Sequence, residues 1–418
     1  MTAKDLHASL SEASPQGEQD IPLLSIIIPT RNRKEYAASA IRSILSIPSE
    51  DFELIVQDNS DNDELLALLA SQAHDTRLRY HHTKDRLDVI ANFNQALELA
   101  HGEYFTFIGD DDGINPEVMD AVRWAKKEGL DALTPTLVAD YFWPDMTQKY
   151  YGNKFAGNLR VRPFNGNISF PDVQKGMREC AQKAGQNLVH FTALPKVYYG
   201  IVKRACMEKV REKTGTYFPG VSPDMSGAMA VASYVKRLGV VDYPLFVPGS
   251  SRKSTAGSSA RKQHLGRLQD QPHLPYGCWE RWPDRVPAFF AVQTVWAQSL
   301  VRTLEVTERQ DILQSFNTPL LHAMCATFNP SYFRFSLRNY YRYLKLTRSS
   351  YLLGSAQLLV GFAGTWALRI RAKAQLFASV AAPKDDVFTD LPSIEVAVNA
   401  LSRALEAKNR TFISMVGE

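Results

Sequence analysis

Short apolar runs alternate with amphipathic stretches through the first third of the chain. Continuous apolar runs predict buried strands, and apolar residues spaced three or four apart predict helices. The predicted strands are residues 23–28, 52–56, 78–80 and 104–108, with another that begins at residue 132. The first predicted helix carries Ala40, Ile41, Ile44 and Leu45 on one face. Further helices are predicted at residues 65–69, 89–100 and 116–128. This alternation predicts an α/β fold, Rossmann-like, with a mostly parallel sheet flanked by helices on both faces.

Polar residues collect directly after three of these strands, at residues 30–34, 58–63 and 110–112. In a parallel sheet the carboxyl ends of neighbouring strands lie at the same edge. This edge is also where open α/β sheets bind their ligands. We therefore expect the three loops to border one ligand site.

Three adjacent aspartates, Asp110, Asp111 and Asp112, follow the predicted strand at residues 104–108 and are separated from it only by Gly109. Three adjacent carboxylates repel one another and lose hydration there unless a cation or hydrogen-bond donors compensate. Hard divalent cations bind one or two such carboxylates, with further oxygens from water and a substrate phosphate. The alternative is a solvated acidic turn, which requires no particular neighbours.

The composition is that of a soluble globular protein with room for two or three domains. The chain has 418 residues, 45% of them hydrophobic and 22% charged, and a net charge of +4. Its cysteines lack metal-binding spacing, which favours a reducing, cytoplasmic compartment. Residues 1–20 are polar and predict a disordered leader rather than a signal peptide.

A Ser- and Gly-rich tract at residues 249–260 predicts a flexible connection. We place a domain boundary there, between an α/β domain at 21–250 and a mainly helical region at 251–418. Within the first domain, residues 141–167 are aromatic and rich in Gly and Asn, which predicts an irregular excursion beside a substrate cleft. Residues 195–202 are apolar again and are expected to return to the sheet.

Three motifs together resemble the family 2 glycosyltransferases, which have a GT-A fold. They are Ser25-Ile26-Ile27-Ile28-Pro29-Thr30-Arg31-Asn32-Arg33, Val56-Gln57-Asp58-Asn59-Ser60, and Ala100-His101-Gly102-Glu103-Tyr104 running into the triple aspartate. Each motif is common alone, but their order and spacing are specific. The resemblance covers the first domain and leaves the helical region outside it.

The resemblance implies a nucleotide-diphosphate sugar as donor, with a UDP-sugar expected. In this family the loop after the first strand borders the nucleotide, and arginine there can meet a phosphate with paired hydrogen bonds. Asp58 stands where the family's aspartate contacts the base, and Asp88 is a second candidate for that contact. The expected donor-binding residues are Pro29, Thr30, Arg31, Arg33, Asp58, Asp88, Asp110 and Asp111.

The resemblance also implies a divalent cation, Mn²⁺ or Mg²⁺, at the aspartates. Asp112 is the favoured ligand, with either Asp110 or Asp111 beside it, and we place the metal on Asp110 and Asp112. The chain departs from the commoner family pattern at two places. Gly109 stands where the first carboxylate often lies, and Phe93-Asn94-Gln95-Ala96 replaces an Arg-Asn-x-Gly run, which leaves the base identity open.

An inverting glycosyl transfer needs a carboxylate to take the proton from the acceptor hydroxyl. The family places this carboxylate before a helix, well after the metal motif. Asp224 fits that position, although a helix N-cap is the alternative for an aspartate there. Asp172 and Asp242 are weaker rivals, and His264 follows the flexible tract, where some family members bring a histidine to the metal.

The C-terminal region has no Asp or Glu from residue 312 to 384. Residues 352–368 form an uncharged stretch that is short and polar for a membrane-spanning helix. We expect an interfacial attachment to anionic lipid, with packing against the catalytic domain as the alternative and no nucleic acid partner. The basic residues in this region are Arg334, Arg338, Arg342, Lys345, Arg348, Arg369, Arg371, Lys373 and Lys384.

The sequence thus predicts a metal-dependent, inverting glycosyltransferase. Its expected acceptor is a glycan or a lipid-linked glycan in surface polysaccharide assembly. Its expected place is the cytoplasm, peripheral on the inner face of the membrane. The alternatives are a nucleotidyltransferase on the same sheet and a non-catalytic module that binds sugar nucleotides or glycans. The loop after the first strand contains no glycine, whereas a nucleotidyltransferase would be expected to have a Gly-rich phosphate loop there.

Overall fold

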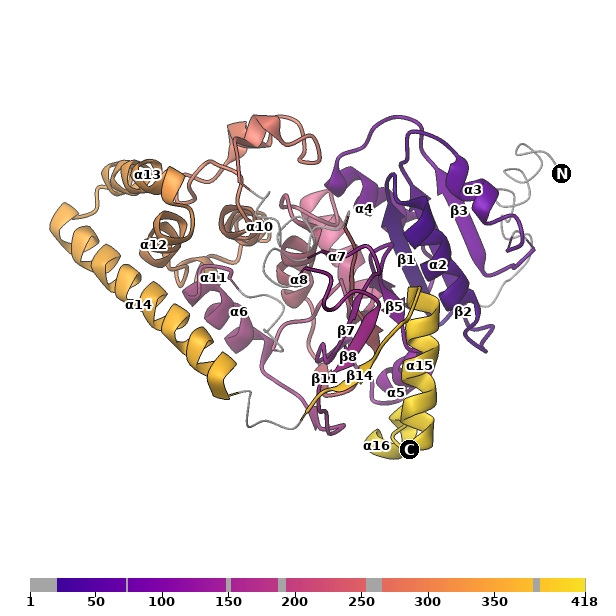
Figure 1. The fold of residues 1–418 in the computed structure, drawn as a ribbon. Coiled ribbons are helices and arrows are strands. Elements are labelled where there is room, and N and C mark those ends of the chain that lie inside the picture. The colour runs from indigo at the N-terminus through magenta and orange to yellow at the C-terminus, as the bar shows by residue number, and fades with distance from the viewer. Residues whose placement is uncertain are drawn as a thin grey trace.

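The computed structural model describes residues 21–72, 74–147, 152–186, 193–252, 265–378 and 384–417, with side chains left undescribed at 372–378. The predicted leader, His264 and most of the predicted flexible tract lie outside these residues. Figure 1 shows a twisted sheet with helices on both faces and a helical region that extends from one side. The predicted fold class, a mostly parallel α/β sheet with a helical region, is confirmed.

Eight strands of the described residues form the central sheet, in the order β3-β2-β1-β4-β10-β6-β11-β9. The pairs among the first four strands are parallel, as is the pair of β6 with β11, whereas β10 and β9 run antiparallel to their neighbours. The strands are β1 (Leu24–Thr30), β2 (Phe52–Asp58), β3 (Leu78–His82), β4 (Tyr104–Phe107), β6 (Ala132–Pro135), β9 (Ile168–Ser169), β10 (Ile201–Lys203) and β11 (Leu238–Val241).

The sheet separates two apolar cores, because successive side chains of a strand point to opposite faces. Ile26 and Ile28 lie in one core and Ile27 in the other. The first core is covered by α2 (Lys34–Leu45), α5 (Val118–Lys127) and α15 (Ile394–Ala407). The second is covered by α4 (Val89–Glu98), α8 (Pro223–Ala232) and α10 (Val292–Val306).

The carboxyl ends of β1, β2 and β4 lie at one edge of the sheet, as predicted. Thr30 pairs in register with Asp58, and Ile27 pairs with Phe107. β1 continues through Pro29 instead of ending before it, because its pairing with β4 stops at Ile27 and leaves only β2 beside the proline. The loops after these three strands therefore surround one site.

The segment predicted as an irregular excursion contains regular structure, and that prediction was wrong in part. β7 (Ala139–Phe142) and β8 (Asn158–Val161) form an antiparallel pair, which β13 (Gly249–Ser250) and β14 (Asp386–Phe388) extend on either side. Burial alternates along β7, so one side of this small sheet is covered. Beside it β5 (Gly113–Ile114) pairs with β12 (Phe246–Val247).

The helical region packs against the second core and consists chiefly of α10, α11 (Gln310–Leu313), α12 (Thr318–Phe328), α13 (Phe333–Leu346) and α14 (Tyr351–Ala378). The chain then returns to the α/β body, where β14 joins β8 and α15 packs on α2 (Figure 1). The last helix of the described residues, α16 (Phe412–Val416), contacts α5. Shorter or peripheral helices are α3 (Glu64–Leu68), α6 (Val173–Gln182), α7 (Arg204–Thr214), η2 (Leu268–Asp270), η3 (Cys278–Arg281) and η4 (Pro330–Tyr332).

Candidate active site

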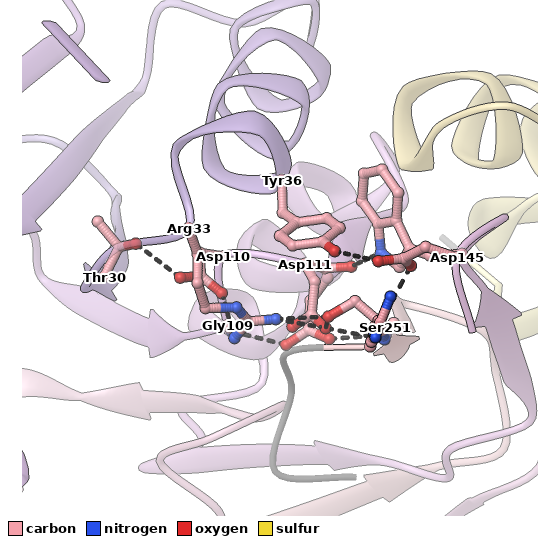
Figure 2. Close-up of polar contacts among 12 residues, drawn as sticks. Thr30, Arg33, Tyr36, Gly109, Asp110, Asp111, Asp145 and Ser251 are labelled. Atoms are coloured by element: carbon pink, nitrogen blue, oxygen red, sulfur yellow. Dashed lines mark hydrogen bonds and ion pairs between the residues drawn. The ribbon is translucent and has the colours of Figure 1, made fainter. Parts of the chain in front are cut away.

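The loop after β1 supplies a cation to the aspartates after β4. The Arg33 Nη1 atom lies 2.6 Å from Asp110 Oδ1, and its Nη2 atom lies 2.7 Å from Asp111 Oδ2. Thr30, the last residue of β1, donates a hydrogen bond of 2.6 Å from Oγ1 to Asp110 Oδ2. Figure 2 shows the side chains of Thr30, Arg33 and Asp110 turned toward one another at the edge of the sheet. Arg33 and Thr30 are therefore brought to the acidic triplet, as expected of a shared ligand edge.

Asp112 is held by hydrogen bonds to both of its oxygens. Oδ1 accepts one of 2.7 Å from the Gly249 amide, and Oδ2 accepts one of 2.6 Å from the Gly109 amide. Oδ2 also accepts hydrogen bonds from the hydroxyls of Tyr199 (2.7 Å) and Tyr198 (3.1 Å). Asp112 thus ties the loop after β4 to two other segments of the chain.

Burial and mutual repulsion dominate the electrostatics of the triplet. Burial raises the pKa of Asp110, although the Arg33 charge opposes this shift. Burial also raises the pKa of Asp112, and the neighbouring Asp111 charge adds to the effect. Burial alone would lower the pKa of Arg33, but Asp110 and Asp111 raise it above its ordinary value. Arg33 pairs with two of the three buried carboxylates, and the hydrogen-bond partners of Asp112 among the described residues are uncharged donors, so the site favours additional positive charge.

The segment after β12 closes the other side of the triplet. Ser251 donates a hydrogen bond of 2.7 Å from Oγ to Asp111 Oδ2 and accepts one of 2.7 Å from Arg33 Nη2 (Figure 2). Trp143 Nε1 donates a hydrogen bond of 2.9 Å to the Asp111 carbonyl oxygen. Gly249 is required here, because a Cβ atom at this position would lie 1.8 Å from that same carbonyl oxygen.

Of the other predicted donor-binding residues, Arg31 follows β1, Asp58 ends β2, and Asp88 lies between β3 and α4. Asp58 is fully buried, and its carboxylate accepts hydrogen bonds from the Ser60 amide (2.8 Å) and the Tyr80 hydroxyl (2.6 Å). Arg31 reaches Asp61 rather than the triplet, with 2.6 Å between Nη2 and Oδ1. Asp88 is the N-cap of α4 and accepts a hydrogen bond of 2.9 Å from the Ala91 amide.

Asp224 lies in the first turn of α8 and accepts a hydrogen bond from the Ser222 hydroxyl. Ser222, two residues earlier, is the N-cap residue, so Asp224 is not itself the N-cap of α8. Phe218, at the start of this segment, packs edge-on against Phe107 at the end of β4, with 5.7 Å between ring centroids. This contact brings the entrance of α8 to the end of the strand that carries the triplet.

The two rival carboxylates have local structural partners. Asp172 is the N-cap of α6 and accepts hydrogen bonds from the Gln174 and Lys175 amides. Asp242 accepts one from the Thr136 hydroxyl and one of 2.9 Å from the Asn165 amide. These hydrogen bonds account for both residues without a role at the triplet.

Sequence reasoning missed Tyr198, Tyr199 and Ser251. Tyr199 has a backbone φ of +58°, which is rare for a bulky residue and marks a locally constrained conformation. It lies just before β10, where its hydroxyl and that of Tyr198 both reach Asp112. The adjacent tyrosine pair was the only signal in the sequence. Tyr198 lies 86 residues from its partner, Asp112, and no local pattern reveals a contact over that separation.

The oxygen-only chemistry of the triplet fits a hard divalent cation. Asp110 Oδ1 is buried without a hydrogen bond but lies 2.6 Å from Arg33 Nη1, so a metal at this oxygen would share it with the guanidinium or displace the guanidinium. Among the described residues no group of three or more His, Cys, Asp or Glu has the arrangement of a metal site. A metal would therefore share or take over the oxygens that now contact Arg33 and the tyrosines.

The comparisons with known proteins agree with this architecture. The model of the family described as glycosyl transferase family 2 matches residues 25–172. That range includes β1, β2, β4 and the acidic triplet. The match confirms the predicted recognition of a family 2 glycosyltransferase for residues 25–172, and the mostly parallel sheet with flanking helices confirms the predicted fold class.

Several curated proteins are similar to parts of the chain. The putative colanic acid biosynthesis glycosyl transferase WcaA of Escherichia coli is 40% identical over 110 residues, which are 26% of this chain and 39% of WcaA. The GalNAc(5)-diNAcBac-PP-undecaprenol beta-1,3-glucosyltransferase of Campylobacter jejuni is 32% identical over 111 residues, which are 26% of this chain and 36% of that enzyme. The chain thus spans less than two fifths of the length of either relative.

Two further similarities extend over more of the chain. The uncharacterized glycosyltransferase YfnE of Bacillus subtilis is 28% identical over 231 residues, which are 54% of this chain and 56% of YfnE. Among solved structures, TarS 1–349 of S. aureus in complex with UDP-GlcNAc aligns with 78% of this chain and 93% of its own, at 15% identity and a TM-score of 0.42.

Proposed function

We propose that the protein transfers a sugar from a nucleotide-diphosphate sugar, with a UDP-sugar as the expected donor, to a hydroxyl group of an acceptor, with inversion at the anomeric carbon. The observation that carries the proposal is the acidic triplet, buried at the end of β4 and joined to Thr30 and Arg33 from the loop after β1. A diphosphate needs positive charge, and Arg33 can provide it directly. Arg31, Pro29, Asp58 and Asp88 are proposed to border the nucleotide.

A divalent cation, Mn²⁺ or Mg²⁺, is proposed to complete the donor site. Asp110 is the first ligand we propose, because its buried Oδ1 atom accepts no hydrogen bond and a metal there would have to displace only the Arg33 guanidinium. For the second ligand, Asp112 would have to exchange a tyrosine hydrogen bond, whereas the contacts of Asp111 with Arg33 and Ser251 fall on Oδ2 and leave Oδ1 to a metal. When bound, the cation would stabilise the negative charge of the departing diphosphate.

Asp224 is proposed as the general base. Its carboxylate would accept the proton of the acceptor hydroxyl while that oxygen forms a bond to the anomeric carbon. The bond from the anomeric carbon to the diphosphate breaks in the same step, and the nucleoside diphosphate leaves with its electron pair. Two features support this role: the segment that leads into α8 packs through Phe218 against Phe107 at the end of β4, and Asp224 is partly exposed, whereas the triplet is buried.

The proposed acceptor is a glycan, free or lipid-linked, in surface polysaccharide assembly. The similar proteins from Escherichia coli and Campylobacter jejuni are named for colanic acid biosynthesis and for a substrate linked to undecaprenol diphosphate. We propose that the protein works in the cytoplasm against the inner face of the membrane. The absence of acidic residues from 312 to 384 supports this location, since anionic lipids attract such a segment.

The experiment that tests the function measures release of nucleotide from a panel of nucleotide sugars, with and without Mn²⁺. One donor should release nucleotide in the presence of Mn²⁺, and Asp110→Asn should abolish both this release and Mn²⁺-dependent donor binding. Binding of a nucleotide sugar without release in any condition, even with acceptor glycans added, would favour the non-catalytic binding module. Release of inorganic diphosphate from a nucleoside triphosphate and a sugar phosphate would favour the nucleotidyltransferase.

A further inference from the structure

Helix α14 has an apolar inner face that packs tightly on the helical region. Gly354, Leu358, Gly361 and Thr365 are buried and follow one another at spacings of three and four. The contact with α12 is close, since a Cβ atom on Gly361 would lie 2.9 Å from the Pro319 carbonyl oxygen. This stripe fixes how α14 is rotated, and with it which side chains point away from the protein.

The outer face of α14 is also apolar, and it is exposed. Leu352 is 85% exposed, Leu359 70%, Val360 72% and Ile370 65%. No charged residue occurs in the helix before Arg369. A surface helix in water normally turns a polar face outward, and a contiguous apolar face of this kind marks a binding surface. In Figure 1 this helix forms the outer border of the helical region.

The helix extends beyond the uncharged stretch 352–368 that the sequence predicts to be too short and polar for a membrane span, and this corrects that prediction. Residues Tyr351–Arg371 make the one helix of the described residues that is long and apolar enough to cross a membrane. The connections at its two ends exclude a crossing in this fold. At the start of α14, the Tyr340 hydroxyl of α13 donates a hydrogen bond of 2.9 Å to the Gly354 carbonyl oxygen. After the end of α14, β14 pairs with β8 of the α/β body. A crossing helix would place β14 and β8 on opposite sides of the bilayer and break their pairing, so α14 does not cross a bilayer in this fold.

Charge identifies the kind of surface. Arg348 precedes α14, and Arg369 and Arg371 lie in its later turns, all exposed and within a region that lacks acidic residues from 312 to 384. Tyr351 and Trp366, near the two ends of the apolar face, are 51% and 55% exposed. Aromatic residues with polar edges favour the level of lipid head groups. A second copy packed on α14 would bring two basic regions together, whereas an anionic bilayer would complement both the charge and the apolar face.

We propose that α14 lies in the plane of an anionic membrane surface, with its outer face inserted at the boundary between head groups and acyl chains. The inference deepens the proposed membrane location and rests on it, but it is independent of the donor chemistry. A cavity of about 890 Å³ between α12, α13 and α14 shares Leu353 and Val360 with the outer face. This cavity offers apolar room beside the inserted face for part of an acyl chain.

Vesicle flotation of the full chain tests the proposal. The protein should float with vesicles of phosphatidylcholine and phosphatidylglycerol, and weakly or not at all with phosphatidylcholine alone. The triple variant Leu352→Gln, Leu359→Gln, Val360→Gln should lose at least tenfold in binding, because all three side chains are exposed and apolar. The matched control, Leu68→Gln, Val396→Gln, Ile413→Gln, changes exposed aliphatic residues on other elements and should bind normally.

Arg369→Gln with Arg371→Gln should weaken binding to anionic vesicles and reduce its dependence on salt. Equal binding by the apolar triple variant and its control would overturn the proposal. A soluble dimer that the triple variant dissociates, with no vesicle binding by the parent chain, would assign the face to a second copy instead. Donor turnover, measured in parallel without lipid, should be the same in all these variants, so a failure here is distinguishable from a failure of the proposed activity.

The depth of α14 distinguishes an in-plane helix from a spanning one. Fluorescent labels attached to cysteine at positions 352, 359 and 370, one at a time in a Cys278→Ser background, can be quenched by lipids brominated at different depths. Cys180, Cys206 and Cys325 are buried and should not label. An in-plane helix predicts the same shallow depth for all three labels. A deep label at 359 between shallow labels at 352 and 370 would refute the proposal.

Discussion

The Arg33 guanidinium lies 2.6 Å from the Asp110 carboxylate, across the gap between the loop after β1 and the loop after β4. The same side chain reaches Asp111 at 2.7 Å. Arg33 therefore supplies positive charge that offsets part of the negative charge of the acidic triplet in this structure. A divalent cation that uses the same oxygens of Asp110 or Asp111 must compete with it, which makes Arg33 a determinant of metal affinity as well as a candidate phosphate ligand.

This competition predicts that Arg33→Gln raises the affinity for Mn²⁺. Removing the guanidinium frees Asp110 and Asp111, and we expect at least a tenfold gain in binding without donor, measured by calorimetry. The metal-free variant should be less stable than the parent chain by about 3 kcal/mol, because the buried carboxylates lose their partner. Lys34→Gln is the matched control, since Lys34 pairs with Glu64 on the surface and should change neither quantity measurably. Unchanged or weaker Mn²⁺ binding by Arg33→Gln would refute the competition.

Asp224→Asn should separate chemistry from binding. Asparagine keeps the shape of the side chain but cannot accept the acceptor's proton, so turnover should fall by about 10²–10⁴-fold while donor affinity stays the same. The control is Asp242→Asn, which weakens the hydrogen bonds from Thr136 and the Asn165 amide. It should lower stability while leaving turnover of the folded enzyme intact. Steady-state kinetics with titrated donor binding checks both. Full turnover by Asp224→Asn would leave Asp224 with a structural role only.

Gly249→Ala should destabilise the protein. The added Cβ atom would lie 1.8 Å from the Asp111 carbonyl oxygen, so the two loops must move apart. We expect a loss of about 1–3 kcal/mol in the free energy of unfolding, measured with urea. Gly364→Ala is a suitable control, because its Cβ would come no closer than 3.8 Å to the nearest side-chain atom and the change favours a helix. Equal urea midpoints for the two variants would show that the loop after β4 adapts freely.

His322 predicts a loss of stability in mild acid. Burial lowers its pKa from the ordinary 6.5 to about 4, although its two ring nitrogens face the Ser336 and Arg285 carbonyl oxygens. The unfolded chain therefore binds a proton near pH 6.5, whereas the folded chain does so only near pH 4. The stabilisation is complete above pH 6.5 and falls by about 1.4 kcal/mol for each pH unit below it, until pH 4.

Urea unfolding at pH 7 and pH 5 measures this effect, with His322→Gln as the comparison. The variant lacks the titrating ring, so its stability should change less between the two pH values than that of the parent chain. The carboxylates that also begin to titrate near pH 5 are common to both proteins and cancel in the comparison. Parallel changes in the two proteins would mean that His322 is protonated in the fold.

The α/β architecture could be read from local pattern. The apolar runs that became β1, β2 and β4 are short, continuous and bounded by polar loops, so their type and their common edge followed from rules for parallel sheets. Boundaries shifted by a few residues where pairing decided them, as at Pro29, which lies within β1 because only β2 pairs there. The hairpin of β7 and β8 was missed, because its strands are short and its neighbours, β13 and β14, come from distant parts of the chain.

The sequence by itself also determined the identity of the chemical groups at the site, since three consecutive aspartates and the basic loop after β1 are visible in the chain. Only the tertiary structure decided how those groups are paired. The sequence favours Asp112 as a metal ligand, but it does not reveal the hydrogen bonds from Tyr198 and Tyr199 to Asp112, or the Arg33 side chain that bridges Asp110 and Asp111. The physical reason is that a local pattern records which residues are adjacent along the chain. The neutralisation of a buried charge depends instead on partners that are distant in sequence and brought close by the sheet.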